Sequence, residues 1–177
     1  QVNDIYTYDD YKYTFEEDVA GWHAVVNDKT KTTYGVMLHS INNTDITSNK
    51  DTFKGCSQLV ELNPNFRIPS NVVSTHAMFS GCTNLTTIPA GMILPSKVET
   101  AQQMFNNCRA LKSLPSTFSI PSSVTDMSKM FSQCRALEKL PENLMTNCHA
   151  SKIDNTFAYC ASLTYLPKNF KLPEEAT

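Results

Sequence analysis

The stretch VTDMSKMFSQCRAL, residues 124–137, decides the fold of this chain, because its spacing recurs along the sequence. Phe131 lies three residues before Cys134, and Leu137 lies three residues after it. The same trio returns every 26 residues, at Phe53, Cys56 and Leu59, at Phe79, Cys82 and Leu85, at Phe105, Cys108 and Leu111, and at Phe157, Cys160 and Leu163. These three positions form columns that repeat without slippage.

Two proline columns and a valine column complete the unit. Prolines stand at Pro89, Pro115, Pro141 and Pro167, and again at Pro69, Pro95, Pro121 and Pro173. Proline breaks a helix and limits a strand to a few residues, so these columns mark turns. Valine recurs at Val72, Val98 and Val124, and Ile46 lies one period before Val72. A partial coil is therefore expected ahead of the first full one.

The period predicts a solenoid, because a unit of about 20–50 residues with fixed apolar columns buries its apolar edge against the next copy. We interpret the segment between the two leucines of each unit as a short strand and SSVT, residues 122–125, as a second extended piece. The segment from Met130 to Cys134 is expected to be a tight turn or a single helical turn. Stacking predicts narrow parallel sheets. We place about five coils at residues 46–177 and an N-terminal β cap at residues 1–45.

The column cysteines are expected to form a ladder inside the array, with equivalent residues about 4.8 Å apart. Stacked side chains point the same way, which is poor geometry for disulfides, and the number of column cysteines is odd. We expect reduced, buried thiols whose S–H groups bond turn carbonyls. Cys148 lies off the column, in the coil that lacks its second proline, and is expected to be the most accessible of the six.

The N-terminal segment lacks the repeat and reads as a β-hairpin cap. The stretches YKYTF (11–15), WHAVV (22–26) and YGVML (34–38) are strand-like, and the polar turn NDKTKT joins the last two. The first coil of a solenoid needs a cover, so we expect Trp22, Val26 and Val36 to pack onto it. The alternative is a ligand-binding role for exposed tyrosines, namely Tyr6, Tyr8 and Tyr11.

Composition and motifs offer no support for a catalytic, metal-binding or nucleic-acid-binding function. The net charge of −2 gives no electrostatic attraction to nucleic acid or anionic membrane, and no apolar run reaches the roughly 18 residues of a membrane span. Neither the histidines nor the cysteines show the short paired spacing of a zinc site. Cys148 and His149 are adjacent, but no orienting third group accompanies them, so an altered loop is the favoured interpretation. We predict no enzyme, no cofactor and no direct membrane insertion.

The units FSGCTNLTTIPAGMILPSKV, FNNCRALKSLPSTFSIPSSVTDMSKM and FSQCRALEKLP resemble the BspA-like leucine-rich repeats and the related repeats of mycoplasma-type surface lipoproteins. The resemblance covers about residues 46–177 and rests on the phenylalanine-x-x-cysteine turn followed by a leucine-rich strand. It implies a leucine-rich-repeat solenoid in a secreted or cell-surface bacterial protein that serves adhesion or protein recognition. It implies no catalytic residues.

The favoured function is recognition of a protein partner, a host or surface component, by outward positions that vary between units. The expected partner-binding residues are Glu61, Thr87, Arg109, Lys112, Ser113, Arg135, Glu138, Lys139 and Tyr165. Lys112 and Glu138 occupy one column in adjacent coils and are expected to form an exposed ion pair. The rival is a structural or spacer module within a larger cell-surface or virion assembly.

The last coil is expected to need a cover. A stack that ended at this coil would expose the apolar edge of Leu163, Leu166, Phe170 and Leu172, a kind of patch that soluble monomers rarely leave bare. We expect further coils or another domain beyond Thr177, or another chain packed on this edge.

Overall fold

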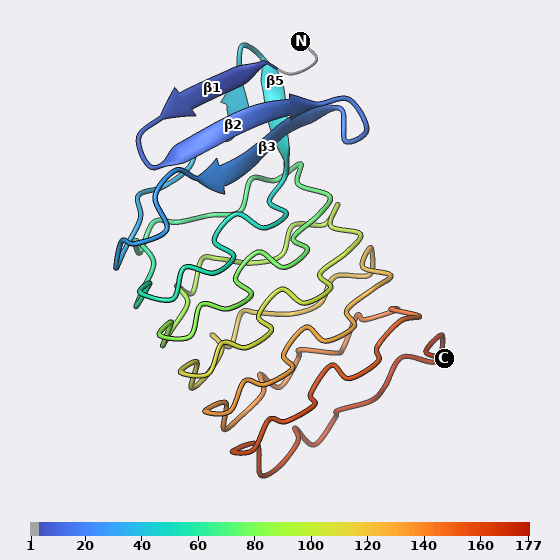
Figure 1. The fold of residues 1–177 in the computed structure, drawn as a ribbon. Helices are drawn as coiled ribbons and strands as arrows, with labels where there is room; N and C mark the ends of the chain where they lie inside the picture. Colours follow the sequence, from blue (N-terminus) through green and yellow to red (C-terminus); the bar gives the residue numbers. More distant parts are fainter. Residues whose placement is uncertain (1–3) are drawn as a thin grey trace.

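A computed structural model describes residues 4–177, and Figure 1 shows a β-sheet at one end followed by successive layers of chain. The strands are β1 (Ile5–Tyr8), β2 (Tyr11–Glu16), β3 (Gly21–Val26), β4 (Ser40–Ile41) and β5 (Thr44–Ser48). Within residues 4–177 there is no helix. Of the two expected alternatives for the phenylalanine-cysteine segment, the tight turn is confirmed and the single helical turn is wrong.

The N-terminal sheet is mixed, with strand order β1-β2-β3-β5-β4. Strands β1, β2 and β3 form an antiparallel meander, and β3 then pairs in parallel with β5, where Trp22 lies opposite Ile46. Trp22 and Val26 are buried, as the cap interpretation requires. β5 also runs across the position at which we divided cap from array.

The predicted strand at residues 34–38 is wrong, and the hairpin is instead formed by β2 and β3. The hydroxyl groups of two tyrosines in β2 form hydrogen bonds with the backbone of residues 34–38. These bonds take the place of those that a neighbouring strand would make. Tyr11 Oη donates to the Gly35 carbonyl at 2.5 Å, and the Leu38 N–H donates to Tyr13 Oη at 2.9 Å. Val36 consequently points outward with an exposed fraction of 49%, and Tyr11, which we expected to be exposed, is fully buried.

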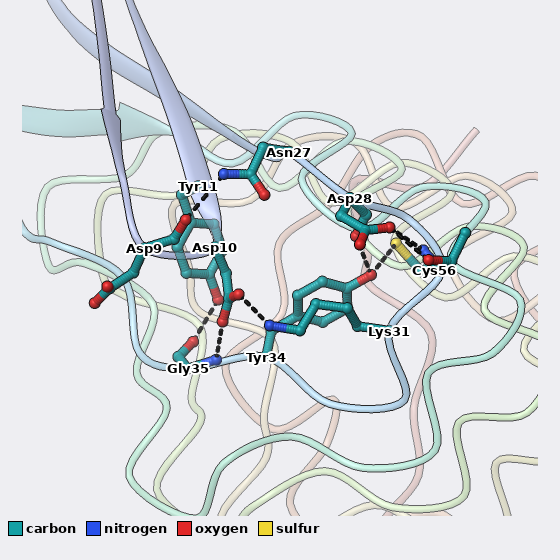
Figure 2. A network of polar contacts seen from close by, with 10 residues as sticks. Asp9, Asp10, Tyr11, Asn27, Asp28, Lys31, Tyr34, Gly35 and Cys56 are labelled. Carbon is teal, nitrogen blue, oxygen red and sulfur yellow. Dashed lines mark hydrogen bonds and ion pairs between the residues drawn. The ribbon is translucent and has the colours of Figure 1, made fainter.

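Figure 2 shows the polar network that fixes the loop after β3. The Asp10 carboxylate accepts hydrogen bonds from Gly35 N, at 2.7 Å, and from Lys31 Nζ. Burial raises the pKa of Asp10, but these two donors more than offset it, and the net pKa lies below the ordinary value of 3.8. Tyr34 Oη donates to the Asp28 carbonyl at 2.6 Å. The loop is thereby held against β2 and the turn at Asp9 and Asp10.

The N-terminal sheet is joined to the layers through β5. Ser48, at the end of this strand, begins a column of parallel bridges that continues one residue per layer. The bridged residues are Ser48, Ser74, Thr100, Asp126 and Lys152. Ile46 is fully buried in β5, so the partial coil expected there takes the form of a sheet strand.

A ladder of backbone hydrogen bonds runs along the turns that contain the phenylalanine and cysteine. In each of four successive interfaces, four N–H groups donate to carbonyls 25 residues later, over 2.7–3.0 Å. In the third interface the donors are Ala101, Gln103, Phe105 and Asn107. The turns, not the leucine segments, therefore carry most of the bonding between layers.

The turns depend on two columns of left-handed residues that we did not predict. The first column holds Asp51, Ala77, Gln103, Lys129 and Asn155, and the second holds Gly55, Gly81, Asn107, Gln133 and Tyr159. Their φ angles lie between 50° and 77°. Gly and Asn adopt this conformation readily, whereas side chains such as Lys and Tyr adopt it at a cost. The glycines and the asparagine of the second column were the available signal.

The predicted leucine strands are wrong as regular strands. Only one backbone bond per interface joins these segments, from Thr86 N to Val60 O, from Lys112 N to Thr86 O and from Glu138 N to Lys112 O. The proline that follows the second leucine in most units lacks an N–H group and prevents a longer ladder.

The core is a continuous stack of side chains. The phenylalanine rings of successive layers lie nearly parallel, with centroid separations of 5.0–5.7 Å from Phe53 to Phe157. The leucine and valine columns of the middle layers are buried around them. Each ring therefore contacts its equivalents in the layers before and after it.

All six cysteines are free, and four of the five column cysteines are buried. Cys82 Sγ donates to the Phe53 carbonyl at 3.1 Å, and Cys108, Cys134 and Cys160 repeat this contact with the phenylalanine carbonyl of the preceding layer at 3.1–3.2 Å. The predicted bond to a turn carbonyl is confirmed for these four cysteines.

The prediction that Cys148 is the most accessible of the six cysteines is wrong. Cys148 is buried with its sulfur 3.6 Å from Met127 Sδ, and Cys160 of the last layer is the more exposed thiol.

Candidate functional site

The predicted partner-binding residues lie on both sides of the sparse backbone ladder through Val60, Thr86, Lys112 and Glu138, which is stacked in register at 3.0–3.3 Å. All nine are exposed: Glu61, Thr87, Arg109, Lys112, Ser113, Arg135, Glu138, Lys139 and Tyr165. The loop after β3 extends this ladder, because Val60 N donates to the Thr32 carbonyl at 2.9 Å. We call the surface formed by these nine residues the ladder surface.

A shallow hollow of about 380 Å³ marks the C-terminal part of the ladder surface. It is lined by Glu138, Lys139, Ser162, Thr164 and Tyr165, three of which belong to the predicted set. An acid, a base and a tyrosine with an exposed fraction of 59% therefore face one depression. Such a mixture suits polar and aromatic contacts with a macromolecule rather than an enclosed small ligand.

The charged groups of the ladder surface are not paired with one another. The expected ion pair between Lys112 and Glu138 does not form, although their backbones are bonded at 3.1 Å. The ion pairs within residues 4–177 lie elsewhere, at Glu16–His23, Asp10–Lys31 and His149–Glu175. Arg109 Nε instead donates to Asn107 Oδ1 at 2.6 Å. Stacking of two backbones does not by itself bring long exposed side chains together, because an exposed ion pair gains little electrostatic energy and costs side-chain conformational entropy.

The thiols are poor nucleophiles. Burial raises the pKa of each of the six cysteines, including Cys108 in the middle of the ladder. A cysteine nucleophile needs a thiolate and a base within reach. His149 Nδ1 contacts Glu175 Oε1 at 2.8 Å, while Cys148 Sγ faces Met127. The adjacent Cys148 and His149 thus have separate partners.

Neither a metal cluster nor a membrane-spanning helix occurs in the part of the chain that the structure describes. Between residues 4 and 177, histidine, cysteine and acidic side chains form no group of three suited to a metal ion. The same residues contain no helix long and apolar enough to cross a bilayer.

A second hollow, of about 340 Å³, lies over the turns of the last three layers. Gln103, Asn106, Gln133, Asn155 and Tyr159 are among its lining residues. We did not predict this site. Its sequence signal is a gathering of amide side chains at turn positions that follow the 26-residue period.

Two solved structures are similar to this chain. A leucine-rich repeat protein from T. pallidum superposes with a TM-score of 0.60 at 21% identity, over 93% of this chain and 81% of that one. A leucine-rich cell surface protein from Faecalibacterium prausnitzii A2-165 gives a TM-score of 0.46 at 16% identity, over 92% of this chain and 54% of that one. The first likeness establishes a leucine-rich-repeat fold. No curated protein sequence matches the chain.

A family model matches residues 23–144 and carries the description "Mycoplasma protein of unknown function, DUF285". This range includes strand β5, the first three full units and part of the fourth. The predicted resemblance to BspA-like and mycoplasma-type repeats is confirmed by this match and by the leucine-rich-repeat fold. Because the match covers more than half of the 177 residues, the chain belongs to the DUF285 family.

Proposed function

We propose that this chain is a non-catalytic recognition module that presents its ladder surface to a protein partner at the surface of a bacterial cell or in secreted form. The layers, related by 26 residues, are inferred to form one solenoid, on which exposed side chains vary while the core columns recur. The observation that carries the proposal is the hollow at Glu138, Lys139 and Tyr165, where exposed charged and aromatic groups converge.

The unpaired charges support recognition as the role of this surface. Arg109, Arg135 and Lys139 are exposed and form no ion pair within residues 4–177. Complementary charges steer encounters and select partners more than they add affinity. A surface that keeps its charges free can offer them to an acidic region of another protein. The alternative role, a spacer within a larger surface assembly, requires no such free charges.

The test compares charge reversal on the ladder surface with equal reversal elsewhere. Purified extracellular matrix proteins are immobilised, and binding of the chain is measured by surface plasmon resonance. Arg109→Glu, Arg135→Glu and Lys139→Glu together should weaken binding to a responsive matrix protein by roughly tenfold or more, mainly through slower association. The control combines Lys12→Glu, Lys54→Glu and Lys97→Glu, which changes the net charge equally and alters exposed residues outside the ladder surface.

Equal binding by both variants would place the interface on another face. Absence of binding to the whole matrix panel would favour the spacer role. Thermal unfolding of both variants checks that the layers remain folded.

A further inference from the structure

The second hollow, of about 340 Å³, lies on the face formed by the turns, outside the ladder surface. It crosses three successive layers, whose stacked phenylalanines lie 5.6 and 5.7 Å apart. The backbone beneath it is fixed, because Gln103, Lys129 and Gln133 donate their N–H groups to the next layer at 2.7–2.9 Å. The side chains above therefore stand on a rigid base.

Four of the eight residues that line the hollow carry amide side chains, and these amides have no hydrogen-bond partner among the described residues. Within residues 4–177, no hydrogen bond engages the side chains of Gln103, Asn106, Gln133 or Asn155. Two asparagines elsewhere on the layers do have partners: Asn71 Nδ2 donates to Asp45 Oδ2 at 2.6 Å, and Asn84 Nδ2 donates to the Ser57 carbonyl at 2.8 Å. Each free amide offers one acceptor oxygen and two donor hydrogens to a ligand.

Tyr159 adds an aromatic platform at the edge of the amides. Its exposed fraction of 75% is high for so large a side chain, and its left-handed φ of 60° fixes the backbone that carries it. A tyrosine ring combines an apolar face with a polar tip. The apolar C–H face of a sugar ring can stack on such a surface while its hydroxyls reach the amides.

We propose that this turn face binds a neutral oligosaccharide of two or more sugar units. Sugar hydroxyls donate and accept hydrogen bonds, as the four amides do. Lys129 is the only charged residue in the lining, and no carboxylate contributes to it, so neither a cationic ligand nor a strongly acidic one is favoured. The extent over three layers fits a chain of rings better than a single ring.

The experiment uses the 177-residue chain and neutral hexasaccharides of glucose, N-acetylglucosamine, galactose and mannose, observed by saturation-transfer NMR. At least one should receive saturation and shift the side-chain NH₂ signals of Gln133 and Asn155. Tyr159→Ala and Gln133→Ala should each raise its Kd by roughly tenfold. Gln58→Ala, an exposed glutamine in the first layer, is the matched control and should leave Kd unchanged.

No saturation of any hexasaccharide would overturn the proposal, as would an unchanged Kd in Tyr159→Ala. A hexapeptide of Gly, Ala and Ser is the comparator, and a shift of the same NH₂ signals by this peptide but by no sugar would assign the site to peptide binding instead. Charge reversal at Arg109, Arg135 and Lys139 should not change sugar binding, so failure of this proposal and failure of the ladder-surface proposal are distinguishable.

Discussion

At the scale of single residues, Phe105 joins the middle layers of the stack. Its ring is fully buried, stacks between Phe79 at 5.4 Å and Phe131 at 5.6 Å, and meets Phe118 edge-on at 5.9 Å. Phe105→Ala should lower the free energy of unfolding by about 3–5 kcal/mol, because both flanking layers hold the cavity open. Urea unfolding followed by circular dichroism measures this loss. Phe157→Ala, in the half-buried last layer, is the comparison and should cost clearly less. Equal losses would contradict the link between the burial of each ring and its contribution to stability.

At the scale of the repeating turn, the left-handed columns set which residues each unit tolerates. Gly81 has φ 77°, and a Cβ there meets only ordinary contacts with Gly55, so the cost of a side chain lies in the backbone conformation. Gly81→Ala should destabilise the chain by about 1–2 kcal/mol. Gln133 occupies the same column two layers on, with φ 62°, and already bears a Cβ. Gln133→Ala should therefore change stability by less than about 0.5 kcal/mol. The change in stability is measured from the urea midpoints of the two variants at equal m-values. Equal losses of stability in Gly81→Ala and Gln133→Ala would contradict the conformational explanation.

At the scale of the whole molecule, the two ends of the stack of layers differ in their hydrogen bonding. β3 and the loop after it supply the first layer with partners, including a bond from Val26 N to Thr52 O at 3.0 Å. In the last layer, the N–H groups of Ile153, Asn155, Phe157 and Tyr159 occupy the donor positions of the ladder but have no acceptor among residues 4–177. Leu166 and Leu172 are exposed beside them. This face combines an open hydrogen-bonding edge with apolar surface, which favours association.

The 177-residue chain should therefore self-associate through its last layer unless another segment or chain covers that layer. Light scattering during size-exclusion chromatography should show a mass that rises with concentration, and Leu166→Lys with Leu172→Lys should restore the monomer. Ile93→Lys, at an equally exposed isoleucine of a middle layer, is the control and should not restore the monomer. A monomer at every concentration would contradict this expectation.

The period, the core columns and the chemistry of the column cysteines could all be predicted from the order of the residues. Each unit packs its apolar side chains against the equivalent side chains of the next unit, so phenylalanine, cysteine and leucine recur at fixed positions. A hydrogen bond from Cys108 to a turn carbonyl could therefore be predicted, although the structure was needed to identify the acceptor as Phe79. The nine candidate residues of the ladder surface could also be located, because outward positions follow from the same period.

Other features depend on contacts between segments that are distant in the chain. Residues 34–38 have the pattern of a strand, yet the hydroxyls of Tyr11 and Tyr13 bond their backbone, and those contacts join segments far apart in the chain. Cys160 is the accessible thiol because no further layer covers it here, whereas Cys148 is enclosed by the layer before it. The left-handed turns hold Lys129 and Tyr159 in a conformation that their own preferences oppose. The hydrogen bonds between stacked layers offset that cost, and such bonds exist only once the layers have assembled.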